Sequence, residues 1–154
     1  ESMDIVYWAL SQQQGVGVVS ELASVHREMA QALLQQLMSD YLPAMHRFKY
    51  PDRFENVDVD ASWIVMEHYF QKLEDLLGAG AYLFGELSFV DLAVFPLIRQ
   101  GAIIDKAQWD ALAMPNLKRW YTSISDSAAF QACMRKFQPW QGGEGVVVDF
   151  SKPE

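Results

Sequence analysis

The stretch from Gly85 to Gln100 reads GELSFVDLAVFPLIRQ and carries the sharpest local signal in the 154-residue chain. Ser88 is expected to cap a helix, because its hydroxyl can accept a hydrogen bond from a free amide of the first turn. Asp91 stands three residues later, which is the spacing of a capping box. The following residues are apolar on nearly every helical face, and Pro96 interrupts them. We predict a kinked helix buried at the centre of a bundle, with Ser88 and Asp91 as its structural capping box.

Helical periodicity extends to both sides of this segment. Upstream, Asp58 or Asp60 can cap a helix whose apolar residues recur at spacings of three and four. They are Val59, Trp63, Met66, Phe70, Leu73 and Leu77. An earlier helix begins after Ser20 and is expected to end or kink at Pro43. Downstream, Pro115 and Ser127 each mark a further helix start. Because no strand pattern interrupts these helices, the sequence predicts an all-α helical bundle.

Composition and charge narrow the range of functions. Twelve Lys and Arg against 20 Asp and Glu give a net charge of −8. Such acidity repels phosphate backbones and anionic lipid, so neither nucleic-acid nor membrane partners are expected. The single cysteine, Cys133, cannot form an internal disulfide, which favours a reducing, cytoplasmic location. The three histidines lie 20 and 22 residues apart without a cysteine partner, so no metal site is predicted.

Taken together, four segments resemble the glutathione S-transferase family. GELSFVDLAVFPLIRQ resembles the capping box and central helix of its all-α C-terminal domain, although only two residues separate Gly85 from Ser88 where three are commoner. MPNLKRWYTSI (residues 114–124), SAAFQACMRKFQPW (residues 127–140) and FKYPDRF (residues 48–54) resemble later helices and an inter-helix loop. The resemblance implies a C-terminal-type helical domain over residues 20–140, followed by a tail at 141–154.

The first residues resemble the acidic-residue–Ser motif that opens the last helix of the family's thioredoxin-like domain. The resemblance implies that Glu1 and Ser2 hold the γ-glutamyl end of glutathione, since a helix start binds a carboxylate and an acidic side chain pairs with an ammonium. Ser2 can equally be an ordinary helix cap. Residues 1–13 would then be the remnant of that helix and 14–19 a linker. The rest of the thioredoxin-like domain, with its catalytic residue, is expected to be missing from this sequence.

The resemblance also implies a function. The helices after the linker would form the wall that receives a small hydrophobic electrophile or a disulfide, for conjugation to glutathione or thiol–disulfide exchange. Tyr41, His46, Phe48 and Tyr50 are candidates for this wall, or else core and interdomain residues. Glutathione would be a co-substrate, with no metal, and the protein a homodimer formed through residues 20–41 and 58–77. The alternative is a non-catalytic helical module for docking or dimerisation.

Overall fold

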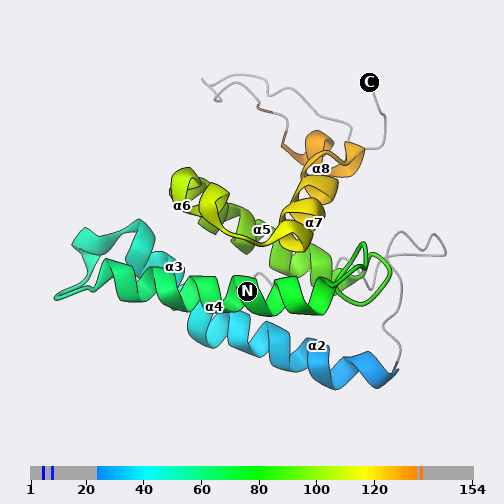
Figure 1. Cartoon of the computed structure of the whole chain (residues 1–154), viewed down its shortest axis with the longest axis horizontal. Coiled ribbons are helices and arrows are strands. Elements are labelled where there is room, and N and C mark those ends of the chain that lie inside the picture. The colour runs from blue at the N-terminus through cyan, green and yellow to red at the C-terminus, as the bar shows by residue number, and fades with distance from the viewer. Residues whose placement is uncertain (1–4, 6–7, 9–23, 135, 137–154) are drawn as a thin grey trace.

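The computed structural model describes Ile5, Trp8, residues 24–134 and Lys136. This part of the chain is helical and contains no strand beyond an isolated bridge between Phe84 and Glu86, so the all-α prediction is confirmed (Figure 1). In order, the elements are α2 (Ser24–Gln36), a π-helical turn (Leu37–Tyr41), α3 (Leu42–Lys49), a 3₁₀ turn (Pro51–Arg53), α4 (Val59–Leu77), α5 (Phe89–Ile104), α6 (Lys106–Ala111), α7 (Pro115–Ser125) and α8 (Ala128–Cys133). None of the described helices is both long and apolar enough to cross a bilayer.

Several expectations fall on parts of the chain that the structure does not describe. Glu1, Ser2, the predicted linker at 14–19 and the tail at 141–154 all lie outside the described residues. From the expected first helix, Ile5 and Trp8 have helical backbone, and their side chains are 66% and 64% exposed.

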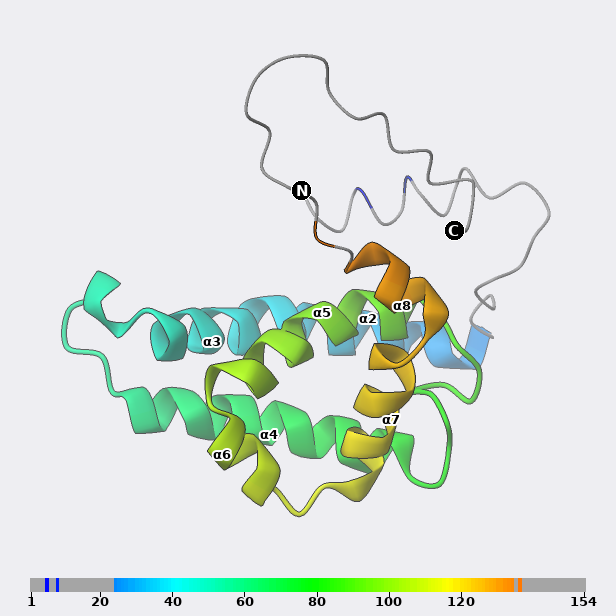
Figure 2. The same ribbon diagram turned by 90° about the horizontal axis from the view of Figure 1, so that it is seen from above.

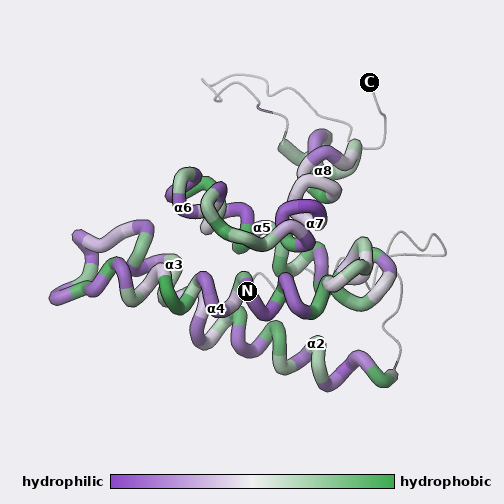
Figure 3. Tube along the Cα trace, viewed as in Figure 1, coloured by the Kyte–Doolittle hydropathy of each residue, from purple (hydrophilic) through white to green (hydrophobic). Residues whose placement is uncertain are grey.

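Two long helical runs set the length of the molecule. The run from α2 through α3 lies along α4, and α5 lies between the two in the view of Figure 2. Helix α4 packs against α3 and α7, whereas α5 contacts α2, α3, α6 and α7. Figure 3 shows polar and apolar segments alternating along α2 and α4, as expected for helices that bury one face.

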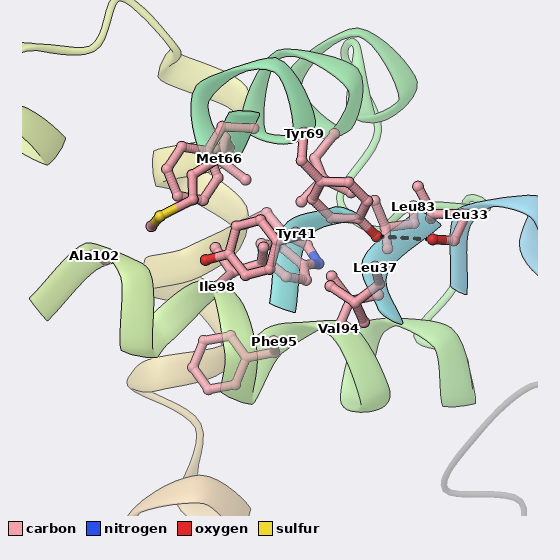
Figure 4. Packing of buried hydrophobic residues seen from close by; sticks show 14 of the residues in the cluster. Leu33, Leu37, Tyr41, Met66, Tyr69, Leu83, Val94, Phe95, Ile98 and Ala102 are labelled. Atoms are coloured by element: carbon pink, nitrogen blue, oxygen red, sulfur yellow. Dashed lines mark hydrogen bonds between the residues drawn. The ribbon is translucent and has the colours of Figure 1, made fainter. Parts of the chain in front are cut away.

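The apolar stripe predicted for α4 forms the middle of the core. Five of its six residues, Trp63, Met66, Phe70, Leu73 and Leu77, are buried, and Val59 is half-buried. Tyr69 adds its ring beside them and donates a hydrogen bond from its hydroxyl to the Leu33 carbonyl, at 3.1 Å (Figure 4). Burial raises the pKa of this phenol, so it stays protonated and remains a donor at physiological pH.

Pro43 does not end the helical run. The chain widens into the π-helical turn just before it, where the Leu42 amide donates to the Leu37 carbonyl, and Pro43 becomes the second residue of α3. A proline inside a regular helix has no amide hydrogen and crowds the preceding turn. The change of winding accommodates the proline, and the helix continues to Lys49.

The predicted caps are present. Asp58 accepts a hydrogen bond from the Ala61 amide at 2.9 Å, and Ser88 and Asp91 form the capping box of α5. The expectation that α5 is buried on nearly every face is wrong, because Leu92 and Ile103 are 40% and 56% exposed. Only one face of α5 packs into the core, and Pro96 lies on the exposed side.

The carboxylate of Asp91 is fully buried and accepts four hydrogen bonds. One oxygen accepts from the amide and the hydroxyl of Ser88, at 2.9 and 2.7 Å. The other accepts from the Leu83 amide at 3.0 Å and from the Trp120 indole at 2.9 Å. Asp91 therefore connects the loop before α5, the start of α5 and helix α7.

Helices α4 and α7 cap each other. The start of α7 has no side-chain cap of its own, and Glu74 of α4 instead accepts from the amides of Asn116 and Leu117, at 3.2 and 2.7 Å. In return, Arg119 of α7 donates to the carbonyls of Gly78 and Gly80, which follow α4. A carboxylate suits the N-terminus of a helix and a cation suits a C-terminus, so both contacts satisfy backbone groups that the helix ends leave free.

Gly101 is the point of closest approach between α5 and the helices beneath it. A Cβ atom there would lie 2.3 Å from the Tyr41 hydroxyl, 3.0 Å from Met66 and 3.1 Å from Phe70. The Tyr41 hydroxyl occupies this space because it donates to the Leu97 carbonyl, at 3.0 Å. Only glycine leaves room for this contact.

We predict that Gly101→Ala lowers the free energy of unfolding by about 1–3 kcal/mol, since overpacking outweighs the better helix propensity of alanine. Tyr41→Phe removes the clashing hydroxyl, so in the double variant the loss should be smaller than the sum of the two single losses. Urea unfolding of all three variants measures this. Strictly additive losses, or a stabilised Gly101→Ala protein, would show that the contact is not tight.

Candidate functional site

The end of α3 and the loop after it form a projecting tip at one end of the molecule (Figure 1). Helix α3 ends at Lys49, because Pro51 disfavours helical backbone in the residue before it. The Tyr50 amide still bonds back to the His46 carbonyl at 2.9 Å, and the Arg53 amide bonds to the Tyr50 carbonyl at 3.0 Å. These bonds hold the loop in a tight turn and fix the positions of its side chains.

Three of the four predicted wall residues lie in this tip. The Phe48 ring packs on Trp63 of α4, with centroids 5.3 Å apart and planes tilted by 43°. Phe48 and Tyr50 are half-buried, and His46 is exposed. The structure therefore places His46, Phe48 and Tyr50 within one short segment that is partly open to solvent.

Tyr41 does not belong to this segment. Its side chain is fully buried, and the centroid of its ring lies 5.2 Å from that of Tyr69. Its hydroxyl donates a hydrogen bond to the Leu97 carbonyl. Burial is the main reason that its pKa is raised, with a smaller contribution from Tyr69. Tyr41 is a core residue that secures α5, consistent with the second of the two roles considered for it (Figure 4).

Basic side chains cover the aromatic rings of the tip. The Arg53 guanidinium lies 4.1 Å from the centroid of the Tyr50 ring, and the Lys49 ammonium lies 5.0 Å from the same ring. Arg47 lies 5.9 Å from the ring of Phe54, whose side chain is 42% exposed. All of these distances fall within the range of cation–π attraction.

The cations also change the chemistry of Tyr50. A hydrogen bond from Lys49 is the main reason that the pKa of the Tyr50 phenol is lowered; partial desolvation opposes it, and the charges of Lys49 and Arg53 add to it. A lowered pKa means that the phenolate is stabilised, which is the opposite of what burial does to Tyr41 and Tyr69. The tip is thus an electropositive environment that favours negative charge.

A groove of about 670 Å³ with a mixed polar and apolar lining lies beside the tip, between the run from α2 to α3 and helix α4. The π-helical turn contributes Ser39 and Asp40 to its lining, and α4 contributes Ser62 and His68. Within the described residues, no group of three or more His, Cys, Asp or Glu side chains could hold a metal ion. The groove offers hydrogen-bonding and charged groups to a ligand.

Sequence reasoning missed two features of this region. The stacking of Lys49 and Arg53 on Tyr50 had a visible signal, since basic and aromatic residues alternate in HRFKYPDRF, residues 46–54. The groove had no such signal, because it arises from the packing of segments that are about 20 residues apart in the chain.

We predict that Lys49→Met and Arg53→Met each raise the pKa of Tyr50, since each removes a cation that stabilises the phenolate. The Lys49 variant should have the larger effect, because it also removes the hydrogen bond. NMR titration of ring-labelled tyrosine, with Tyr50 assigned from the Tyr50→Phe variant, measures the shift. Arg27→Gln in α2 serves as the control for lost charge alone. A Tyr50 pKa that is the same in all three variants would contradict the described arrangement.

Comparison with known protein families finds a match that covers just under half of the chain. Residues 62–133 match the family model of the glutathione S-transferase C-terminal domain. No curated protein matches the chain. The match runs from the first turns of α4 to the end of α8 and includes the Ser88–Asp91 capping box, in an all-α structure. The match therefore supports a glutathione S-transferase C-terminal-type helical domain over residues 62–133.

Proposed function

We propose that this domain forms the co-substrate wall of a glutathione S-transferase-like protein. The family match over residues 62–133 carries the proposal. The partly open aromatic tip supports it, because His46, Phe48 and Tyr50 offer apolar rings and polar edges of the kind that bind small organic molecules. Trp63, inside the matched region, holds Phe48 in place.

In this proposal the co-substrate is a small hydrophobic electrophile or a disulfide, and glutathione is the thiol that reacts with it. Glu1 and Ser2 would hold the γ-glutamyl end of glutathione, as the resemblance of the first residues implies. The wall residues would orient the co-substrate and exclude water, while none of the described residues is assigned a catalytic role. We further propose a cytoplasmic location.

We also propose that the protein is a homodimer formed through α2 and α4. Exposed apolar side chains on these two helices support this arrangement: Val25 and Met29 on α2 are 75% and 50% exposed, and Ile64 and Val65 on α4 are 50% and 38% exposed. Large apolar side chains that remain exposed on a helix face are available for association with a second copy of the chain.

The test compares two phenylalanines in the protein as its gene encodes it. Phe48 and Phe130 are both half-buried and both contact another ring, but Phe130 lies in α8 and packs on Phe95, away from the tip. Phe48→Leu should raise the KM for an aromatic electrophile about fivefold, the effect of losing roughly 1 kcal/mol of ring contact, and leave the KM for glutathione unchanged. Phe130→Leu should leave both unchanged.

If the protein shows no glutathione-dependent activity on either electrophiles or mixed disulfides, the enzymatic proposal is contradicted. A dimer by sedimentation in that case would favour the alternative, a non-catalytic docking or dimerisation module. Equal effects of Phe48→Leu and Phe130→Leu on an active enzyme would instead place the wall elsewhere.

A further inference from the structure

The cations of the tip have no carboxylate partner in the described part of the chain. Arg47, Lys49 and Arg53 lie within seven residues, and none of them is within salt-bridge distance of an Asp or Glu among residues 24–134. Lys49 does bond to the Gln100 side-chain oxygen of α5, at 3.3 Å. Because the Gln100 acceptor is neutral, this hydrogen bond does not compensate the positive charge of Lys49.

Charge is unevenly distributed along this sequence. Residues 46–54 hold three basic residues, Arg47, Lys49 and Arg53, and one acidic residue, Asp52, so their net charge is +2. Because the whole chain carries −8, the other residues together carry −10. A basic segment in an otherwise acidic protein concentrates positive potential at one place, while the rest of the surface repels anions. An anion that approaches this chain is therefore directed to the tip.

The side chains of the tip are arranged as an anion site requires. A guanidinium that stacks flat on an aromatic ring keeps its N–H groups in plane and free at its edges, where they match the two oxygens of a carboxylate. The Arg53 guanidinium carbon lies over the Tyr50 ring, 4.1 Å from its centroid, which is close enough for such a contact. Lys49 lies near the same ring and is anchored to Gln100, so its ammonium is also positioned in advance. Less side-chain entropy is lost when ligands bind to groups that are already ordered.

We propose that Lys49, Tyr50 and Arg53 bind a carboxylate or similar oxyanion carried by an aromatic co-substrate. The proposal rests on the proposed function, and it adds the substrate class: an aromatic molecule with an acidic group, rather than a neutral one. Arg53 supplies paired N–H donors, Lys49 supplies a point charge, and the Tyr50 ring holds the guanidinium in place. The neighbouring rings of Phe48 and Phe54 receive the aromatic part of the same molecule.

Two probes of the same shape test this, 2-naphthoate and its neutral counterpart 2-naphthalenemethanol, with binding measured by isothermal titration calorimetry. We expect 2-naphthoate to bind about tenfold more tightly than 2-naphthalenemethanol, and this difference in affinity should fall at high salt. Arg53→Gln should remove most of this advantage and leave the affinity for the alcohol within about twofold. Lys49→Met should act in the same direction.

Arg27→Gln is the matched control, since it removes one exposed positive charge from α2. Arg27 lies in the first turn of α2, 22 residues before Lys49, which is roughly 33 Å along the helical run. This variant should bind both probes as the unmodified chain does. A structural readout, the circular dichroism spectrum with the unfolding midpoint, confirms that each variant is folded.

The outcomes separate this inference from the proposed function. Equal affinity for the two probes, or equal losses of 2-naphthoate affinity in Arg53→Gln and Arg27→Gln, would overturn the anion site while leaving the aromatic wall intact. A failure of 2-naphthoate to bind at all would also overturn it. Tight 2-naphthoate binding that depends on Arg53 in a protein without transferase activity would support the anion site and contradict only the enzymatic proposal.

Discussion

The fold depends most on the buried carboxylate of Asp91. A carboxylate taken out of water is costly unless its oxygens are fully hydrogen-bonded, and Asp91 has four donors from three parts of the chain. The donors come from the loop at Leu83, from the helix start at Ser88 and from the indole of Trp120. Hydrogen bonding to this one carboxylate therefore fixes the relative positions of α5, its preceding loop and α7. The aromatic core packs around this framework.

A second polar connection extends this framework to α4. Glu74 supplies the cap that α7 lacks, and Arg119 covers the carbonyls after α4. The position of α4 in turn fixes Trp63, on which Phe48 packs, and so holds the tip in place. The candidate site is thus a short projecting loop on a rigid support, an arrangement that keeps binding groups ordered while leaving them accessible.

Local sequence patterns correctly predicted the features that depend on interactions between residues close together in the chain. The capping box, the Asp58 cap, the helix start at Pro115 and the apolar stripe of α4 depend on residues three or four positions apart, and all are present. Tyr41 could not be assigned from local patterns, because a tyrosine late in a helix can face either the core or a pocket. The packing of α5 at Gly101 decides that Tyr41 faces the core. Glu74 and its partners lie more than 40 residues apart, so no spacing rule could connect them. The stacking at Tyr50 likewise depends on the turn that Pro51 imposes, although the alternation of basic and aromatic residues indicated its components.

The most direct test of this account is a double-mutant cycle between Asp91 and Trp120, measured by urea unfolding, with Asp58→Ala as the reference for a local, exposed cap. An asparagine in place of Asp91 would keep the size of the side chain but turn its NH₂ group toward two of the donors, so Asp91→Asn should cost at least about 3 kcal/mol, against about 1 kcal/mol for Asp58→Ala. Trp120→Phe should cost less in the Asp91→Asn background than in the unmodified chain, because the indole then no longer donates to a charged carboxylate. A loss of about 1 kcal/mol for Asp91→Asn, with additive effects at Trp120, would show that Asp91 is an ordinary helix cap and that the framework is held by the core alone.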